Sequence, residues 1–336
     1  MKKTLIIITL GCLLCAVLFC VWLADDVSRF TTTTGNLYTG DIRITIPTHQ
    51  PLKTTADMLF RSGVIRSPLY FYGYARLSGY GQRIQAGEYQ LSGIMTPKQI
   101  LEILASGKVY HYKITIPEGF NLNEIAATIA REGLMDEHGF LETARNPGLS
   151  HTLNIDADTV EGYLFPDTYY FTKGTDAERI ISTMTRRFRQ SLTPAMIEQA
   201  GKEGLTIHQA VTLASLIEKE TGADNERPIV SSVFHNRLKR KMRLESDPTV
   251  VYGIDHFDGK ITRQQLATPT PYNTYMCEGL PFGPIASPGL KSILAAIYPA
   301  QTDYLYFVAT NDKTHQFSRT LDEHLKAVRR YQRKSG

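Results

Sequence analysis

The chain has 336 residues, of which 42% are hydrophobic and 21% are charged, a composition typical of one large or two ordinary globular domains. Its formal net charge of +4 is smaller than that of a typical nucleic-acid-binding protein, so no nucleic-acid partner is expected. Only one of the four cysteines, Cys277, lies outside the N-terminal apolar segment, and no HExxH motif occurs. We therefore expect no disulfide framework, no metal site and no cofactor.

An uncharged segment near the start of the chain predicts a transmembrane helix. Residues 4–24 contain no charged side chain, and about 20 apolar helical residues span a hydrocarbon core of about 30 Å. Two lysines precede this segment and two aspartates follow it, so the positive-inside rule places the N-terminus in the cytoplasm. A cleaved signal peptide is the alternative, although Trp22-Leu23-Ala24 is a poor cleavage site. We assign residues 1–24 to the anchor and the polar residues 25–40 to a tether.

An internal repeat follows the tether. The sequence Ile-Thr-Ile-Pro occurs at residues 44–47 and again at 114–117, and each time a helical pattern and a glycine follow it. We therefore expect two copies of a strand–helix–strand–helix unit, at residues 41–108 and 112–188, the second with an insertion. Small βααβ units of this kind resemble LysM modules, which bind N-acetylglucosamine polymers. The alternative is that the units only pack a scaffold.

The segment that begins at Thr206 predicts a helix with a carboxyl group on its apolar face. Thr206 and Gln209 fit a capping box. At about 100° per residue, Glu218 falls within the stripe formed by Ile207 and Val211. A carboxylate on a buried face is costly unless it is paired or neutral. Desolvation is expected to raise the pKa of Glu218, as a general acid that works near neutral pH requires.

The same helix permits a purely structural interpretation. Glu218 could instead form a salt bridge with an arginine, for which Arg227, Arg237 and Arg243 are the candidates. Glu220 projects nearly opposite to Glu218 on the helical wheel, so we expect a structural salt bridge for it.

Eight short motifs, taken in order, are specific enough to indicate a protein family. They are EGYLFPDTYYF (161–171), LASLIEKET (213–221), NERPIVSSVFHNRL (225–238), MRLESDPTVVYG (242–253), YNTY (272–275), GLPFGPIASPG (279–289), TDYLYFVA (302–309) and HQFSRTLDEH (315–324). In this order they resemble the YceG-like (MltG) family of endolytic murein transglycosylases. With the anchor and the LysM-like unit, the resemblance covers nearly the whole chain.

The resemblance implies a lytic transglycosylase that cuts β-1,4 bonds between N-acetylmuramic acid and N-acetylglucosamine within nascent peptidoglycan strands and so terminates their elongation. It implies Glu218, the first glutamate of the EKET motif, as the catalytic residue. It also implies a periplasmic catalytic domain anchored in the inner membrane, with glycan strands and peptidoglycan synthases as partners. The sequence departs from the family pattern at Glu245, where glutamine is usual, and at Phe282 and Ser287.

One carboxyl group suffices for this chemistry. Glu218 would protonate the glycosidic oxygen and then accept the proton of the muramic acid C6 hydroxyl, which closes a 1,6-anhydro ring on C1. Polar neighbours would stabilise the oxocarbenium-like charge or line the substrate groove. The candidates for that role are Asn236, Glu245, Ser246, Asp247, Tyr252, Asn273 and Tyr275. Turn formation and aromatic packing are the structural alternatives for these residues.

Two other functions stay open. A muramidase-like hydrolase would use Glu218 with a second carboxylate, Glu245 or Asp247. A scaffold without catalytic activity would bind peptidoglycan through the repeats. For the whole chain we predict an α+β fold with a transmembrane helix, a LysM-like βααβ module at residues 41–110, and a larger YceG-like catalytic domain at residues 111–336 that contains the second related unit.

Overall fold

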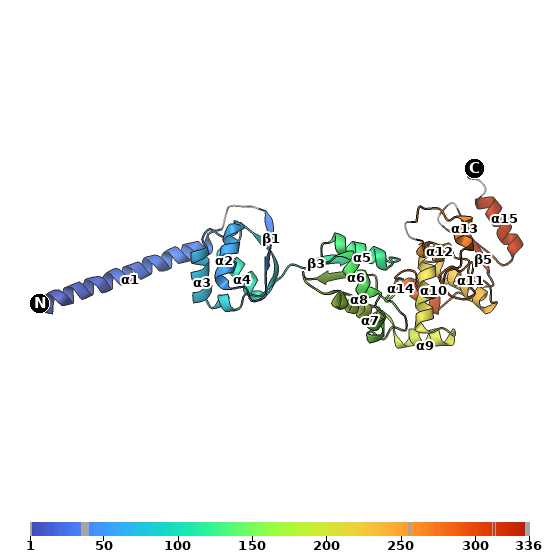
Figure 1. The fold of residues 1–336 in the computed structure, drawn as a ribbon, viewed down its shortest axis with the longest axis horizontal. Coiled ribbons are helices and arrows are strands. Elements are labelled where there is room, and N and C mark those ends of the chain that lie inside the picture. Colours follow the sequence, from blue (N-terminus) through green and yellow to red (C-terminus); the bar gives the residue numbers. More distant parts are fainter. Residues whose placement is uncertain (1, 35–39, 255–256, 311, 313, 333–336) are drawn as a thin grey trace. The chain divides into compact units, whose positions relative to one another are not determined.

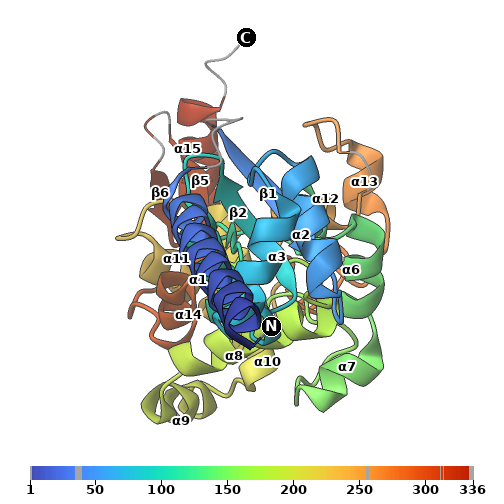
Figure 2. The ribbon, with the colours of Figure 1, turned by 90° about the vertical axis from the view of Figure 1, so that its left-hand side faces the viewer.

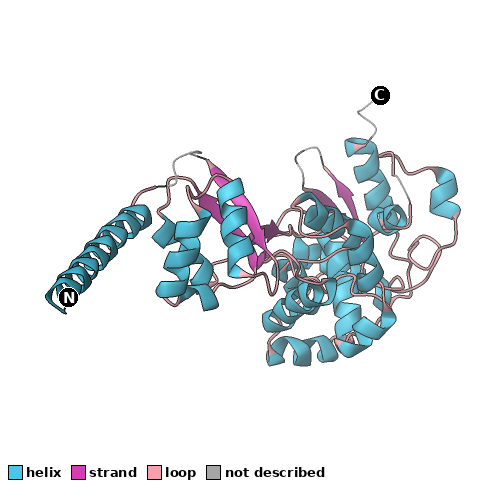
Figure 3. Ribbon diagram, turned by 60° about the vertical axis from the view of Figure 1, so that its left-hand side comes forward, coloured by secondary structure: helices cyan, strands magenta, loops and turns pink. Residues whose placement is uncertain are grey.

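The computed structural model describes residues 2–34, 40–254, 257–310, 312 and 314–332. Two compact units make up the chain, residues 1–112 and residues 113–336. Both combine helices with short strands (Figures 1 and 3), as the predicted α+β class requires.

A long helix, α1 (Lys2–Thr32), opens the first unit. Its stretch Leu10–Thr32 is long and apolar enough to cross a membrane, and the most apolar part of this stretch is not buried against the rest of the protein. A membrane anchor and a signal sequence both fit this helix. Residues 25–32, which were assigned to the tether, continue this helix, and residues 35–39 lie outside the described residues.

The continued helix is held by one ion pair within the helix and by contacts with a later helix of the same unit. Asp25 and Arg29 pair one helical turn apart at 2.9 Å. The Phe30 ring stacks on Tyr70, with the ring centroids 5.4 Å apart, and the Tyr70 hydroxyl donates to Asp26. The polar composition of this segment therefore reflects contact with the folded unit and not an extended linker.

The rest of the first unit has the order strand, two helices, strand, helix. Its elements are β1 (Asp41–Ile46), α2 (Leu52–Arg61), α3 (Pro68–Leu77), the short 3-10 helix η1 (Tyr80–Gln82), β2 (Gly87–Ser92) and α4 (Pro97–Ser106). The strands pair antiparallel, from Asp41 opposite Ser92 to Ile46 opposite Gly87. Figure 2 shows α1 nearly end-on, with α2 and α3 beside each other.

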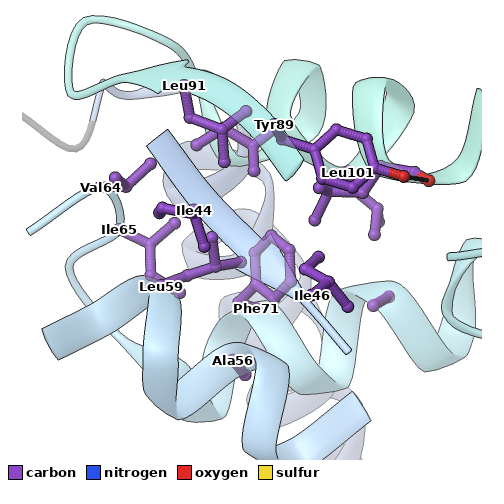
Figure 4. Packing of buried hydrophobic residues seen from close by; sticks show 13 residues of the cluster. Ile44, Ile46, Ala56, Leu59, Val64, Ile65, Phe71, Tyr89, Leu91 and Leu101 are labelled. Atoms are coloured by element: carbon purple, nitrogen blue, oxygen red, sulfur yellow. Dashed lines mark hydrogen bonds between the residues drawn. The ribbon is translucent and has the colours of Figure 1, made fainter. Parts of the chain in front are cut away.

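One face of this two-stranded sheet carries the core of the unit. Alternate strand residues such as Ile44 and Tyr89 are buried against helix side chains that include Leu59, Phe71 and Leu101 (Figure 4). The alternation follows from the period of two along a strand, which places every second side chain on the same face. This core explains why the unit is compact; the likeness to LysM modules stays a prediction.

The second unit is mainly helical. Its elements are β3 (Tyr112–Thr115), α5 (Leu122–Arg131), α6 (Glu137–Ala144), α7 (Pro147–Thr152), β4 (Thr168–Phe171), α8 (Ala177–Ser191), α9 (Pro194–Lys202), α10 (Ile207–Glu220), α11 (Arg227–Lys239), α12 (Asp247–Tyr252), α13 (Arg263–Ala267), α14 (Leu290–Ile297), β5 (Tyr306–Ala309), β6 (His315–Ser318) and α15 (Leu321–Tyr331). Strands β3 and β4 pair with each other, and so do β5 and β6. From β3 to α8 the order is strand, helices, strand, helix, which is the same order of element types as from β1 to α4.

Helix α10 is the central helix of the second unit. It contacts α9, α11, α12 and α14, and every residue from Ala210 to Ile217 is buried. The predicted capping box is confirmed, because the Thr206 side chain accepts from the Gln209 amide and the Gln209 side chain accepts from the Thr206 amide. The run of buried residues ends at Ile217, so the last three residues of α10, from Glu218 to Glu220, carry the side chains that reach the edge of the core.

Candidate active site

The last three residues of α10 are charged: Glu218, Lys219 and Glu220. Each side chain lies in a different environment. Glu218 faces α11 and the start of α14. Lys219 lies beside the loop after β3, where its Nζ donates to the Gly119 carbonyl at 3.3 Å. Glu220 faces the segment that leads into α12. The three surroundings give the two carboxyl groups different chemistry.

Glu218 is held by an arginine and by a backbone amide. Its Oε1 lies 3.4 Å from Nη2 of Arg227, and its Oε2 accepts from the Gly289 amide at 3.0 Å. The Glu218 and Arg227 side chains are only 7% and 6% exposed. Arg227 also pairs with Asp224. The contact is the salt bridge that the sequence left open as the structural interpretation of Glu218.

A second carboxyl group lies near Glu218. The Glu118 carboxyl group lies against Gly289, where a Cβ atom would come within 1.9 Å of its Oε1 and would displace the side chain. Burial, and then the charge of Glu218, raise the pKa of Glu118. The loop that carries Glu118 is fixed on both sides of Ser287, because Gly119 donates to the Ser287 carbonyl and Ser287 donates to the Phe120 carbonyl.

Glu220 occupies a different kind of surrounding. The Ser246 hydroxyl donates to its Oε1, and its carboxyl group lines a cavity of about 320 Å³. Burial raises the pKa of Glu220 to about 7; the Ser246 hydrogen bond opposes this shift, and the charge of Asp247 adds to it. No lysine, arginine or histidine of the described ranges forms an ion pair with Glu220. The structural salt bridge expected for Glu220 is therefore wrong.

Asp247 belongs to two cavities at once. It lines the 320 Å³ cavity beside Glu220, together with Glu245 and Tyr275. It also lines a cavity of about 540 Å³ that includes Lys219 and Tyr252. Both volumes lie in the range of small-ligand sites. Because one carboxylate borders both cavities, they adjoin each other across the end of α10.

The predicted site residues thus fall into two groups. One group lines the adjoining cavities and consists of Glu245, Asp247, Tyr252 and Tyr275. Ser246 belongs with this group because its hydroxyl donates to Glu220, which lines the smaller cavity. The Tyr275 hydroxyl donates to Asp247 at 2.6 Å. Glu245 also pairs with Arg237 at 3.2 Å and has a left-handed backbone, with φ of 49°.

The two asparagines serve the backbone instead. Asn236 donates to the carbonyls of Thr302 and Tyr304 at 2.7 and 3.0 Å. Asn273 is 1% exposed and donates to three carbonyls of α13 and its C-terminal end. Both side chains fix loops, and neither lines the two cavities.

Sequence reasoning missed one buried carboxyl group. Glu161 is 2% exposed, and burial raises its pKa to about 7. Its Oε2 accepts from the Tyr252 hydroxyl at 2.9 Å and from the Leu122 amide at 3.1 Å. The only sequence signal was its position at the head of the motif EGYLFPDTYYF. In the part of the chain that the structure describes, no three His, Cys, Asp or Glu residues are placed to hold a metal ion.

Comparison with known proteins gives a consistent result. A family model described as the YceG-like family matches residues 44–330. A Bacillus subtilis (strain 168) protein named endolytic murein transglycosylase is 35% identical and aligns with 86% of this chain and 84% of its own length. A Streptococcus pneumoniae serotype 2 protein of the same name is 31% identical over 80% of this chain, which spans 54% of that relative.

A solved structure is similar as well. The crystal structure of a YceG-like protein from Listeria monocytogenes has a TM-score of 0.60 and 34% sequence identity to this chain. The match covers 85% of this chain and 98% of the Listeria chain.

Proposed function

Because the chain belongs to the YceG-like family, we propose that it is an endolytic murein transglycosylase that uses Glu220 as its catalytic acid and base. The curated relatives that bear this name support the class of reaction and the peptidoglycan substrate. The observation that carries the proposal is the Glu220 carboxyl group, which has a raised pKa and opens to a cavity.

Protonation is the requirement that separates the two glutamates of α10. A general acid must hold a proton at the working pH, and the ideal pKa lies close to that pH. Glu220 meets this requirement, because burial raises its pKa to about 7. Glu218 instead contacts the Arg227 guanidinium and lines neither of the adjoining cavities.

The reaction then balances on one carboxyl group. Glu220 gives its proton to the glycosidic oxygen, and the bond between C1 and that oxygen breaks. The Glu220 carboxylate next accepts the proton of the muramic acid C6 hydroxyl, and the C6 oxygen bonds to C1 to close the 1,6-anhydro ring. No water is consumed, and the nucleophile is part of the same sugar, so its effective concentration is high.

The neighbours of Glu220 supply the remaining electrostatics. The Asp247 carboxylate lies at the junction of the two cavities, where it would stabilise the positive charge that develops on the sugar ring. Tyr275 orients this carboxylate through its hydroxyl. Ser246 orients the Glu220 carboxyl group. The adjoining cavities then provide room for sugars on both sides of the cleaved bond.

Glu218 remains the alternative acid. Its carboxyl group contacts Arg227 and the Gly289 amide, and proton donation to a sugar would require the loss of both contacts. Our proposal therefore gives Glu218 a positioning role, in which it fixes the start of α11 and α14 behind the site.

The cellular setting is also part of the proposal. With α1 as an uncleaved inner-membrane anchor, both units would lie in the periplasm, where nascent strands emerge. Residues 41–110 would act as a LysM-like glycan-binding subdomain and residues 111–336 as the catalytic domain. Cleavage within growing strands would terminate their elongation close to the synthases that extrude them.

Product analysis tests the class of reaction. Digestion of uncrosslinked glycan strands by the full-length protein, followed by mass spectrometry, should give 1,6-anhydro-muramic acid ends. Reducing ends would indicate the muramidase-like hydrolase. Intact strands that still bind the protein would indicate the scaffold.

A further inference from the structure

The larger cavity has two walls that come from distant parts of the second unit. One wall is the N-terminal end of α5, with Asn121 and Asn123, and the other is α12, which ends at Tyr252. A sugar bound there would touch both walls, so their spacing sets the shape of the site.

One buried carboxyl group joins these two walls. Oε2 of Glu161 accepts from the Tyr252 hydroxyl at 2.9 Å and from the Leu122 amide at 3.1 Å. Leu122 is the first residue of α5, where backbone amides have no partner inside the helix. Glu161 itself does not line the larger cavity. Glu161 lines a separate cavity of about 370 Å³, so it acts on a sugar in the larger cavity through the two walls.

The Glu161 segment is fixed from behind. Gly162 has φ of 84°, and a Cβ there would lie 2.5 Å from Pro284 and 3.0 Å from Val211 of α10. Tyr163, the next residue, bonds His208 of α10 at 3.0 Å. The carboxyl group is thus anchored to the helix that carries Glu220, and it holds α5 and α12 at a set position relative to that helix.

We propose that Glu161 is a positioning residue that fixes Tyr252 and the start of α5 as the walls of a saccharide subsite beside Glu220. This inference rests on the proposed function, because it identifies the occupant of the larger cavity as part of the glycan strand. Glu161 governs how tightly the strand is held, and Glu220 governs how fast the bond is cut.

Kinetics of full-length variants on glycan strands separate these roles. Glu161→Ala and Tyr252→Phe should each raise KM about tenfold to a hundredfold, the range of a lost hydrogen bond to a charged group, with kcat much less affected. The double variant should raise KM by less than the product of the two single effects, because both changes break the same bond. Glu161→Gln, whose amide oxygen can still accept both hydrogen bonds, should recover part of the loss.

A control variant distinguishes positioning from general damage to the loop. Tyr169→Phe removes a buried tyrosine hydroxyl from the same motif, one that donates to the Phe165 carbonyl at 2.5 Å and lies away from the larger cavity. Its thermal stability should fall like that of Tyr252→Phe, while its KM stays at the wild-type value. An unchanged KM in Glu161→Ala, or an equal rise of KM in Tyr169→Phe, would overturn the proposal. A wild-type protein without turnover would count against the proposed function, and calorimetric titration with an N-acetylglucosamine tetramer would then still test the subsite.

Discussion

The two sides of the end of α10 carry the same functional group in opposite conditions. On one side, Glu218 is tied to Arg227 and to the Gly289 amide. On the other, Glu220 has a serine hydroxyl as its partner and a cavity in front of it. The two residues are separated by a single lysine. Burial therefore has different consequences here: Glu218 forms a buried ion pair with a guanidinium, whereas Glu220 has no such partner among the described residues and its pKa is raised to about 7.

The largest expected effect is on catalysis. Replacement Glu220→Gln removes the proton while it keeps the shape, so turnover of glycan strands should fall about 10²–10⁴-fold, the usual contribution of general acid–base catalysis. The matched variant Glu218→Gln keeps an acceptor for the Gly289 amide and should lose far less. Both rates are measured by release of soluble fragments, with thermal unfolding as the check on folding. The reverse order of the two losses would make Glu218 the acid.

The next effect is on stability, on the Glu218 side. Arg227→Met leaves a buried carboxyl group without its charge partner, which should cost about 3–5 kcal/mol of unfolding free energy. Lys291→Met is the control, because Lys291 is 63% exposed and also pairs with Asp224. Its cost should stay below about 1 kcal/mol. Chemical denaturation of the detergent-solubilised protein measures both, and equal losses would show that the Glu218 pair is not structural.

The pH dependence of stability tests the raised pKa of Glu220. The folded pKa of Glu220 is about 7, above its ordinary value of 4.5, so its stabilising contribution is present below about pH 4.5 and is lost as pH rises through about 7. Compared with Glu220→Gln, the wild-type protein should lose on the order of 2–3 kcal/mol between these limits. Denaturation at pH 5 and pH 8 measures the difference. A difference that does not change with pH would contradict the raised pKa.

The smallest effect concerns the serine. The Ser246 hydroxyl bonds Glu220 and holds its pKa down. Ser246→Ala should therefore move the alkaline limb of kcat/KM to higher pH, by less than about one unit for a single hydrogen bond. Ser232→Ala is the control, because Ser232 is equally buried but bonds Thr302, away from both cavities. A shift in the opposite direction would remove Ser246 from the account.

Much of the fold could be predicted from local signals. The capping box at Thr206, the apolar run that forms α1 and the order of elements after each Ile-Thr-Ile-Pro were all accessible, because each depends on residues close in sequence. The family could be predicted from eight short motifs in order. The extension of α1 to Thr32 could not, because it depends on contacts of Asp26 and Phe30 with Tyr70, far along the chain.

The helical wheel could not distinguish the surroundings of the two glutamates, for a physical reason. A helical wheel assumes one buried face, but α10 is buried on all sides. Its polar residues Thr212 and Ser215 are buried too, because Thr212 bonds the His208 carbonyl and Ser215 accepts the Ile285 amide. These residues made the far side of the wheel resemble a surface, so a structural salt bridge was expected for Glu220. Which arginine would meet Glu218 likewise depended on the tertiary fold.

The central claim is that the proton of the active site resides on Glu220. Infrared difference spectroscopy of the full-length protein between pH 5 and pH 9 measures this directly, through the C=O stretch of protonated carboxyl groups. Because the pKa values of Glu220 and Glu161 are both raised to about 7, the account predicts absorbance that titrates near pH 7, of which one part is lost in Glu220→Gln and persists in both Glu218→Gln and Glu161→Gln. A band that is lost in Glu218→Gln and persists in Glu220→Gln would contradict it.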